Sequence, residues 1–268
     1  MPRMRGTEQA LTFADPSGHS VSAVMATPAG NSDRLVLLCH GFLSNKNSKT
    51  NETLTELLLD RGIAACRFDF FGQGDSEGPF ERITLSTALG QVLAALDMAR
   101  ARGYRRIGLV GSSFGGLVAI LAASRAPASG HRLSAVALKC PVPDFPEMLR
   151  LEFGEAGMER WKRSDEIPDV TGGAKPVRLQ SAFYEDCLSY DAYKAAEQIQ
   201  APVLIVQGDR DEYVPLPQSR RLYDALKGRN RLEVLPGADH SFTQPEDFSR
   251  MTTLLAGWMI RHLPPTPG

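Results

Sequence analysis

A serine stands at the centre of the pentapeptide GSSFG (111–115), directly after the apolar run IGLV (107–110). Only Ser113 fits the centre of the pattern G-x-S-x-G, because a frame centred on Ser112 would need a glycine where Val110 stands. In this pattern a sharp strand-to-helix turn exposes the serine hydroxyl, and the glycines leave room for the neighbouring backbone. We therefore predict that Ser113 is a nucleophile.

A serine hydroxyl attacks efficiently only when a base removes its proton, so a histidine is required. Three histidines follow Ser113 in the chain. His131 precedes a strand-like run, at the wrong end of it, and His262 lies near the C-terminal tail. His240 lies in a loop directly after the run LEVL (232–235), and we predict that it is the base. The alternative is a solvated histidine that caps the next helix.

A carboxylate must orient the imidazole, and the segment QGDRDEYVP (207–215) offers three acids directly after another strand-like run. We predict that Asp211 is this acid. Asp209 is the less favoured alternative, because it stands close to the strand end and is well placed to bond loop amides in an Asx-turn. The order serine, aspartate, histidine is one of the orders in which such triads occur.

Acyl transfer also requires donors for the oxygen that becomes negative in the tetrahedral intermediate. We expect one donor to be the N–H of Phe114, which follows the nucleophile at a helix N-terminus. The second is expected to be the N–H of Phe42, in the segment CHGF (39–42) after the first central strand. The imidazole of His40 is interpreted as structural, packing beneath this loop.

Alternating strand-like runs and helix-length segments position these residues. They predict an α/β fold with a mostly parallel sheet and helices on both faces. Strands are expected over 34–39, 64–69, 107–110, 135–138, 202–206 and 232–235, after an antiparallel hairpin over 10–27 that turns at 15–18. Helices are expected over 85–102, 116–124, 220–226 and 248–262, and a disordered tail over 264–268.

The segment from about 141 to 200 interrupts the alternation. It begins with PVPDFP (141–146), contains the turn-rich TGGAKP (171–176) and holds seven aromatic residues. We predict a single domain over residues 1–268, with this segment inserted as a lid over the carboxyl edge of the sheet. Its aromatic residues are more typical of packing than of substrate contact.

Composition argues against several other classes of protein. The formal net charge is −1 and the basic residues are scattered, which disfavours nucleic-acid binding. The four cysteines have no metal-ligand spacing, so we expect no bound metal. We also expect all four to be free thiols, as in a reducing compartment. The N-terminus has no apolar leader and the apolar runs are short of a membrane span. We expect a soluble cytoplasmic protein, a monomer or homodimer with no membrane partner.

The glycine-rich segment GQGDSEG (72–78) does not predict a cofactor site. Three residues rather than two separate its last glycines, and acids stand where a phosphate would lie. We therefore expect no dinucleotide and no other cofactor.

With these motifs the chain resembles the α/β-hydrolase superfamily over nearly its whole length. It is most similar to bacterial esterases of the cinnamoyl and feruloyl type, with kinship to serine aminopeptidases and monoacylglycerol lipases. The resemblance is carried by HGF (40–42), FDFFGQGDSEG (68–78), GSSFGG (111–116), GDRDEYVP (208–215) and GADH (237–240). It implies that Ser113, Asp211 and His240 form the triad, that Phe42 and Phe114 are the oxyanion donors, and that the inserted lid lines the acyl pocket.

The departures from this family lie around the serine. Members commonly carry histidine and glutamine where Ser112 and Phe114 stand, and the bulkier Phe114 is expected to reshape the pocket floor. Dehalogenases and epoxide hydrolases share the fold but need an aspartate nucleophile, so Ser113 argues against both.

We therefore expect a serine esterase that cleaves carboxylic esters through an acyl-enzyme; the resemblance implies aryl or hydroxycinnamoyl esters. The alternatives on the same triad are aminopeptidase, thioesterase and monoacylglycerol lipase activity. A different class of function, a non-catalytic ligand-binding member of the fold, stays open because fold does not determine function.

Overall fold

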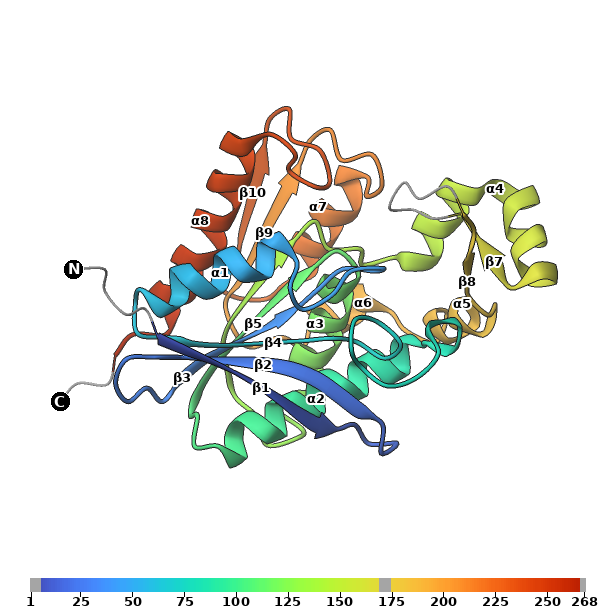
Figure 1. Ribbon diagram of the computed structural model, residues 1–268. Coiled ribbons are helices and arrows are strands. Elements are labelled where there is room, and N and C mark those ends of the chain that lie inside the picture. The colour runs from blue at the N-terminus through green and yellow to red at the C-terminus, as the bar shows by residue number, and fades with distance from the viewer. Residues whose placement is uncertain (1–5, 169–174, 266–268) are drawn as a thin grey trace.

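A sheet of eight strands forms the centre of the computed structural model, which describes residues 6–168 and 175–265 (Figure 1). The strands lie in the order β1-β2-β4-β3-β5-β6-β9-β10. Their bounds are Gly6–Ala14 (β1), Ser20–Pro28 (β2), Arg34–Cys39 (β3), Ala64–Phe68 (β4), Arg106–Ser112 (β5), Leu133–Lys139 (β6), Val203–Gly208 (β9) and Arg231–Leu235 (β10). β2 runs antiparallel to both β1 and β4, and all other neighbours are parallel. The predicted mostly parallel sheet is confirmed.

The predicted hairpin is formed by β1 and β2, and its turn depends on one carboxylate. Asp15 accepts hydrogen bonds from the N–H groups of Ser17 and His19, both at 2.9 Å. Gly18 completes the turn with a φ of +87°, a conformation that side chains rarely adopt. The turn therefore forms where the sequence predicts it.

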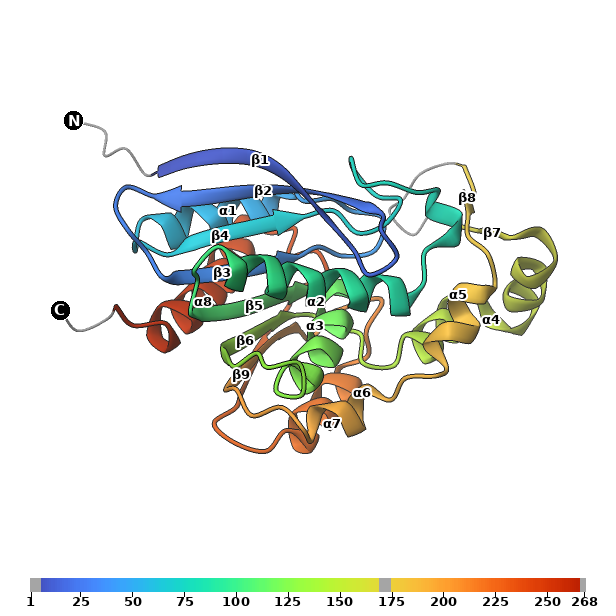
Figure 2. The same cartoon turned by 90° about the horizontal axis from the view of Figure 1, so that it is seen from below.

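Helices cover both faces of the sheet (Figure 2). One face carries α1 (Lys49–Leu59) and α8 (Pro245–His262), and the other carries α2 (Leu85–Ala101), α3 (Phe114–Arg125) and α7 (Leu216–Ala225). In β3, Leu35 and Leu37 enter the core beneath α2 and α3, whereas Val36 and Leu38 enter the core beneath α1 and α8. Because side chains alternate along a strand and both faces are covered, the run is continuously apolar.

The segment between β6 and β9 extends beyond the carboxyl ends of the strands, away from the termini (Figure 1). It contains α4 (Phe145–Ser164), β7 (Glu166–Ile167), β8 (Val177–Arg178), α5 (Ala182–Cys187) and α6 (Ala192–Ala196), and we call it the insertion. α4 is broken at Gly154, where φ is +60°. Most of the predicted turn at 171–176 lies outside the described residues.

The prediction of a disordered tail over 264–268 can be compared with the structure only for the residues that the structure describes. Residues 266–268 lie outside the described chain, whereas Pro264 is placed and its carbonyl accepts a hydrogen bond from Arg106. The prediction of disorder is therefore wrong for Pro264.

A short 3₁₀ helix, Phe80–Arg82, precedes α2.

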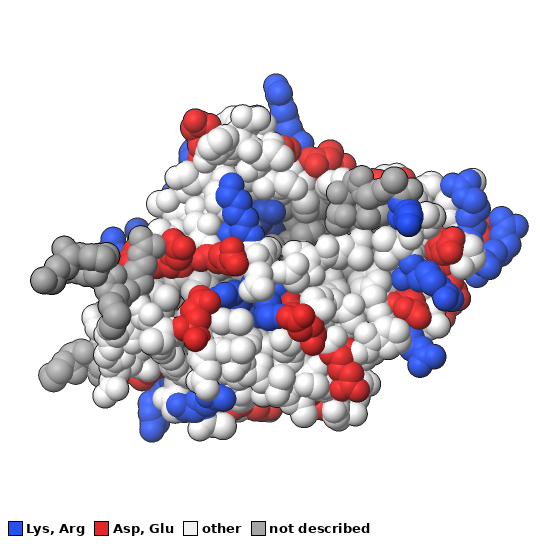
Figure 3. All heavy atoms as spheres, in the orientation of Figure 1, with Lys and Arg blue, Asp and Glu red and all other residues white. Residues whose placement is uncertain are grey.

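All four cysteines are buried free thiols, as the apolar surroundings of three of them predict. No helix among the described residues is long and apolar enough to cross a bilayer. On the face shown in Figure 3, Lys and Arg side chains are interspersed with Asp and Glu.

Candidate active site

Ser113 occupies a sharp turn between β5 and α3. Its φ and ψ are 51° and −117°, a strained conformation for a residue with a side chain. A Cβ on Gly111 would lie 2.3 Å from the carbonyl oxygen of Gly115, and a Cβ on Gly115 would lie 2.4 Å from the carbonyl oxygens of Cys39 and His40. The turn therefore requires both glycines of the motif and holds the serine at the carboxyl end of the sheet.

The structure brings Ser113, His240 and Asp211 together in one hydrogen-bonded chain. The Oγ of Ser113 lies 3.0 Å from Nε2 of His240, and Nδ1 of His240 lies 2.8 Å from Oδ2 of Asp211. Because the carboxylate accepts, Nδ1 carries the proton and Nε2 accepts from the serine hydroxyl. This arrangement can remove the serine proton during attack on a carbonyl.

The Asp211 carboxylate is held by backbone and side-chain hydrogen-bond donors. Oδ1 accepts from the N–H groups of Tyr213 and Val214, and Oδ2 accepts from Nε2 of Gln207 as well as from His240. Burial alone would raise the pKa of Asp211, but the hydrogen bond and charge of His240 and the N–H of Val214 hold the pKa below its ordinary value. The ionised carboxylate is therefore fixed in the orientation that His240 needs.

The prediction that Asp209 forms an Asx-turn is wrong. The Asx-turn belongs to Asp211 itself, through its bond to the N–H of Tyr213. Asp209 instead accepts a hydrogen bond from the N–H of Gly237, in the loop that carries His240. One carboxylate thus contacts the imidazole and the other holds the loop in place.

The predicted oxyanion donors flank the serine. Phe114 begins α3, and Phe42 lies in the loop after β3. Gly41, in the same loop, lies so close to Ser113 that an added Cβ would be 3.5 Å from the serine Cβ. In the described part of the chain, neither the N–H of Phe42 nor that of Phe114 donates to another protein group. Both N–H groups are therefore available to a substrate oxygen.

His40 lies beneath this loop, as the sequence predicts. Its Nε2 accepts from the N–H of Phe70 at 3.0 Å, and its Nδ1 donates to the carbonyl of Gly41 at 2.7 Å. Burial lowers the pKa of His40 to about 4, so its imidazole is neutral. A neutral ring satisfies both backbone groups and supports the loop that carries Phe42.

A buried ion pair ties the same loop to its neighbour. The ammonium of Lys46 contacts Asp69 at 2.5 Å and Asp75 at 2.6 Å, and the N–H of Lys46 also donates to Asp69. Asp75 belongs to the glycine-rich segment 72–78, for which no cofactor is expected, and Asp69 lies just before that segment. That segment therefore anchors the loop after β3.

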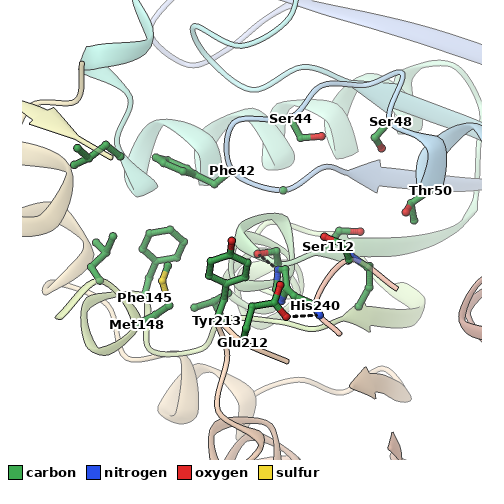
Figure 4. A pocket seen from close by; sticks show the side chains of 17 residues that line it. Phe42, Ser44, Ser48, Thr50, Ser112, Phe145, Met148, Glu212, Tyr213 and His240 are labelled. Atoms are coloured by element: carbon green, nitrogen blue, oxygen red, sulfur yellow. Dashed lines mark hydrogen bonds between the residues drawn. The ribbon is translucent and has the colours of Figure 1, made fainter. Parts of the chain in front are cut away.

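A cavity of about 410 Å³ opens over Ser113. Figure 4 shows Phe42, Phe145 and Met148 on one side of it and Ser44, Ser48, Thr50 and Ser112 on the other. The insertion contributes the apolar residues Val142, Phe145, Met148, Leu149 and Ile167. The cavity is thus divided into an apolar side and a side rich in hydroxyl groups.

Phe114 affects the cavity indirectly. Its ring is fully buried and is not part of the lining, but it packs edge-on against Phe42 at 5.6 Å and Phe145 at 5.5 Å. Phe183 of the insertion lies 5.3 Å from Phe42 and 5.4 Å from Phe145. These four rings join the loop after β3, α3 and the insertion.

One group of side chains has the composition of a metal site. Cys140, Asp211 and His240 offer ligand atoms within 4.8 Å of one another. Burial raises the pKa of the Cys140 thiol above its ordinary value, which favours the protonated thiol, and the thiol donates to Asp211. Protonated sulfur is a poor metal ligand, so these residues fit a hydrogen-bonded network better than a metal centre.

The strand order and the serine turn define an α/β hydrolase. The chain belongs to the alpha/beta hydrolase family, whose model matches residues 36–251.

Comparisons with individual proteins agree with this class. The structure is similar to a putative hydrolase from Agrobacterium vitis S4 (25% identity, TM-score 0.83, 95% of this chain and 99% of that one). It is also similar to Est1E from Butyrivibrio proteoclasticus with bound ferulic acid (25% identity, TM-score 0.81, 94% of this chain and 99% of that one). Among curated proteins, the bovine mitochondrial palmitoyl-protein thioesterase ABHD10 is 24% identical over 79% of this chain and 68% of its own length. These similarities support hydrolase activity.

Sequence reasoning missed two polar residues at the site, Gln207 and Lys139. Each stands at the carboxyl end of a buried strand, Gln207 beneath Asp211 and Lys139 in the wall of the cavity. The available signal was a polar side chain that ends an apolar run at the edge where ligands of parallel sheets bind.

Proposed function

We propose that the protein is a serine esterase that hydrolyses carboxylic esters through an acyl-enzyme. The hydrogen-bonded chain from Ser113 through His240 to Asp211 supports this proposal most directly. Ser113 attacks the ester carbonyl while Nε2 of His240 takes its proton, and the N–H groups of Phe42 and Phe114 bind the resulting oxyanion. His240 then returns the proton to the leaving alcohol, and a water activated by the same nitrogen releases the acid.

The apolar side of the cavity supports an aryl or hydrocarbon group on the substrate. The rings of Phe42, Phe145 and Tyr213 line this cavity, and flat aromatic groups pack well against such rings. The similarity to Est1E, whose structure holds ferulic acid, points to hydroxycinnamoyl esters as a first group to test.

A fluorophosphonate probe tests the nucleophile, because it labels an activated serine and spares an ordinary one. We expect labelling of the wild-type protein at Ser113, and Ser113→Ala is expected to lose labelling and about 10⁴-fold or more in aryl-ester turnover. Ser124→Ala, at the far end of α3, is the matched control. Equal turnover by the Ser113→Ala protein would refute the proposal.

Thioester hydrolysis is a second candidate, supported by the similarity to the thioesterase ABHD10. An oxygen ester and a thioester of the same acyl group separate the two functions. The esterase proposal expects the larger kcat/KM for the oxygen ester.

A further inference from the structure

Lys139 is a buried cation in the wall of the cavity. It is the last residue of β6, pairs in register with Ser112, and is only 8% exposed. No described residue accepts a hydrogen bond from its ammonium or forms an ion pair with it; its contact is with the ring of Phe242, 5.5 Å away. Burying an ammonium without a counter-ion is costly, and a ring face compensates only part of that cost.

The same side of the cavity faces the first turn of α1. Ser48, the N-cap of this helix, and Thr50 both line the cavity. The side chain of Ser48 accepts from the N–H of Asn51, whereas the N–H groups of Lys49 and Thr50 have no acceptor within the described chain. Free N–H groups at the start of an eleven-residue helix favour an anion.

The acid that lines the cavity does not neutralise Lys139. The carboxylate of Glu212 accepts from the N–H of His240 at 3.1 Å. Figure 4 shows Glu212 beside Tyr213, whereas Ser112, the neighbour of Lys139 in the sheet, lies apart from it. The hydroxyl-rich side thus combines a buried cation, a helix N-terminus and several neutral donors.

We propose that Lys139 and the first turn of α1 bind a carboxylate carried by the substrate. The preferred substrate is then an ester that carries an apolar group for the insertion side and a carboxylate remote from the scissile carbonyl. This assignment rests on the proposed esterase function, and it makes Lys139 a specificity-determining residue. The carboxylate can belong to the acid or to the alcohol part of the ester.

Two pairs of esters distinguish these sources. The first pair is 3-(butanoyloxy)benzoate and the corresponding benzamide, which differ in charge on the leaving group. The second pair is the monophenyl ester of adipic acid and its terminal amide, which differ in charge on the acyl group. We expect the wild-type protein to prefer the anionic member of one pair, and Lys139→Met to reduce that preference, measured as a ratio of kcat/KM values, about ten-fold or more.

Lys227→Met is the matched control, because Lys227 lies on the surface and pairs with Glu197. It should leave both ratios unchanged. Wild-type ratios near one in both pairs, or ratios that Lys139→Met leaves unchanged, overturn the proposal. If Lys139→Met does not fold, inhibition of the wild-type protein decides: benzoate should inhibit more strongly than benzamide and weaken as salt increases, whereas equal inhibition overturns the proposal.

The two proposals fail in different ways. If the wild-type protein hydrolyses none of the four esters and the fluorophosphonate leaves Ser113 unlabelled, the esterase function fails. Calorimetric titration with benzoate and benzamide still tests the anion site in that case. Tighter binding of benzoate that is lost in Lys139→Met supports the site, and equal binding overturns it.

Discussion

Replacing Asp211 by asparagine changes one atom that faces His240. Oδ1 of Asp211 accepts from the N–H groups of Tyr213 at 3.0 Å and Val214 at 2.8 Å, so the asparagine oxygen will take this position. Its NH₂ group then occupies the position of Oδ2, 2.8 Å from Nδ1 of His240. A donor at this position forces Nδ1 to accept, and the ring proton moves to Nε2.

This tautomer points an N–H at Ser113, 3.0 Å away, where a proton acceptor is needed. The same NH₂ group also meets Nε2 of Gln207, another donor, at 2.7 Å. The wrong tautomer costs a Ser-His-Asp triad about 10⁴-fold in kcat, which is roughly 5 kcal/mol of activation free energy. We expect a loss of this size for Asp211→Asn.

The assay is steady-state hydrolysis of a short-chain aryl ester, together with the rate of fluorophosphonate labelling. Asp209→Asn is the matched control, because asparagine can still accept from the N–H of Gly237, and we expect it to lose less than about ten-fold. Thermal unfolding of both variants checks that the fold is retained. An Asp211→Asn protein within ten-fold of wild type, or an equal loss in Asp209→Asn, would refute the reasoning about the tautomer.

Two further predictions concern stability. The free energy of unfolding in urea should be about 1 kcal/mol higher for Ser113→Gly than for Ser113→Ala, because glycine relieves the strain at a φ of 51°. A glycine variant less stable than the alanine variant would show that the turn is unstrained. The pKa of His40, about 4 in the folded protein, lies below the ordinary value of 6.5, so the unfolded chain takes up the proton first as the pH falls. The contribution of the neutral His40 imidazole to the free energy of unfolding is therefore complete above about pH 6.5 and falls by roughly 3 kcal/mol towards pH 4, as urea unfolding can measure. The His40→Gln protein should lose less stability over this range. An identical decline in both proteins would contradict a neutral, buried His40.

The central strands and the serine turn could be predicted because their causes are local. A strand covered on both faces must be apolar along its length. A Cβ added at Gly111 or Gly115 would lie only 2.3 or 2.4 Å from neighbouring backbone, so the turn requires glycine at both positions. These constraints leave few alternatives, so the carboxyl ends that carry Ser113, Asp211 and His240 could be located from the sequence.

The remaining features depend on tertiary contacts that no local pattern encodes. Asp209 and Asp211 stand two residues apart in one loop, and only the position of the neighbouring loop determines that one meets Gly237 and the other His240. Lys139 ends a strand and has no acidic neighbour in sequence, so its place in the wall of the cavity could not be predicted from the sequence. The insertion has weak periodicity, and its longest helix is broken at Gly154.

The four packed rings of Phe42, Phe114, Phe145 and Phe183 have a consequence for engineering. Two of them belong to the insertion and one to the loop after β3, which carries the proposed oxyanion donor Phe42. A chimera that exchanges the insertion for that of a relative, in order to change selectivity, also removes half of this support. Such a graft would have to bring aromatic partners for Phe42, or the exchange would reduce turnover for every substrate alike.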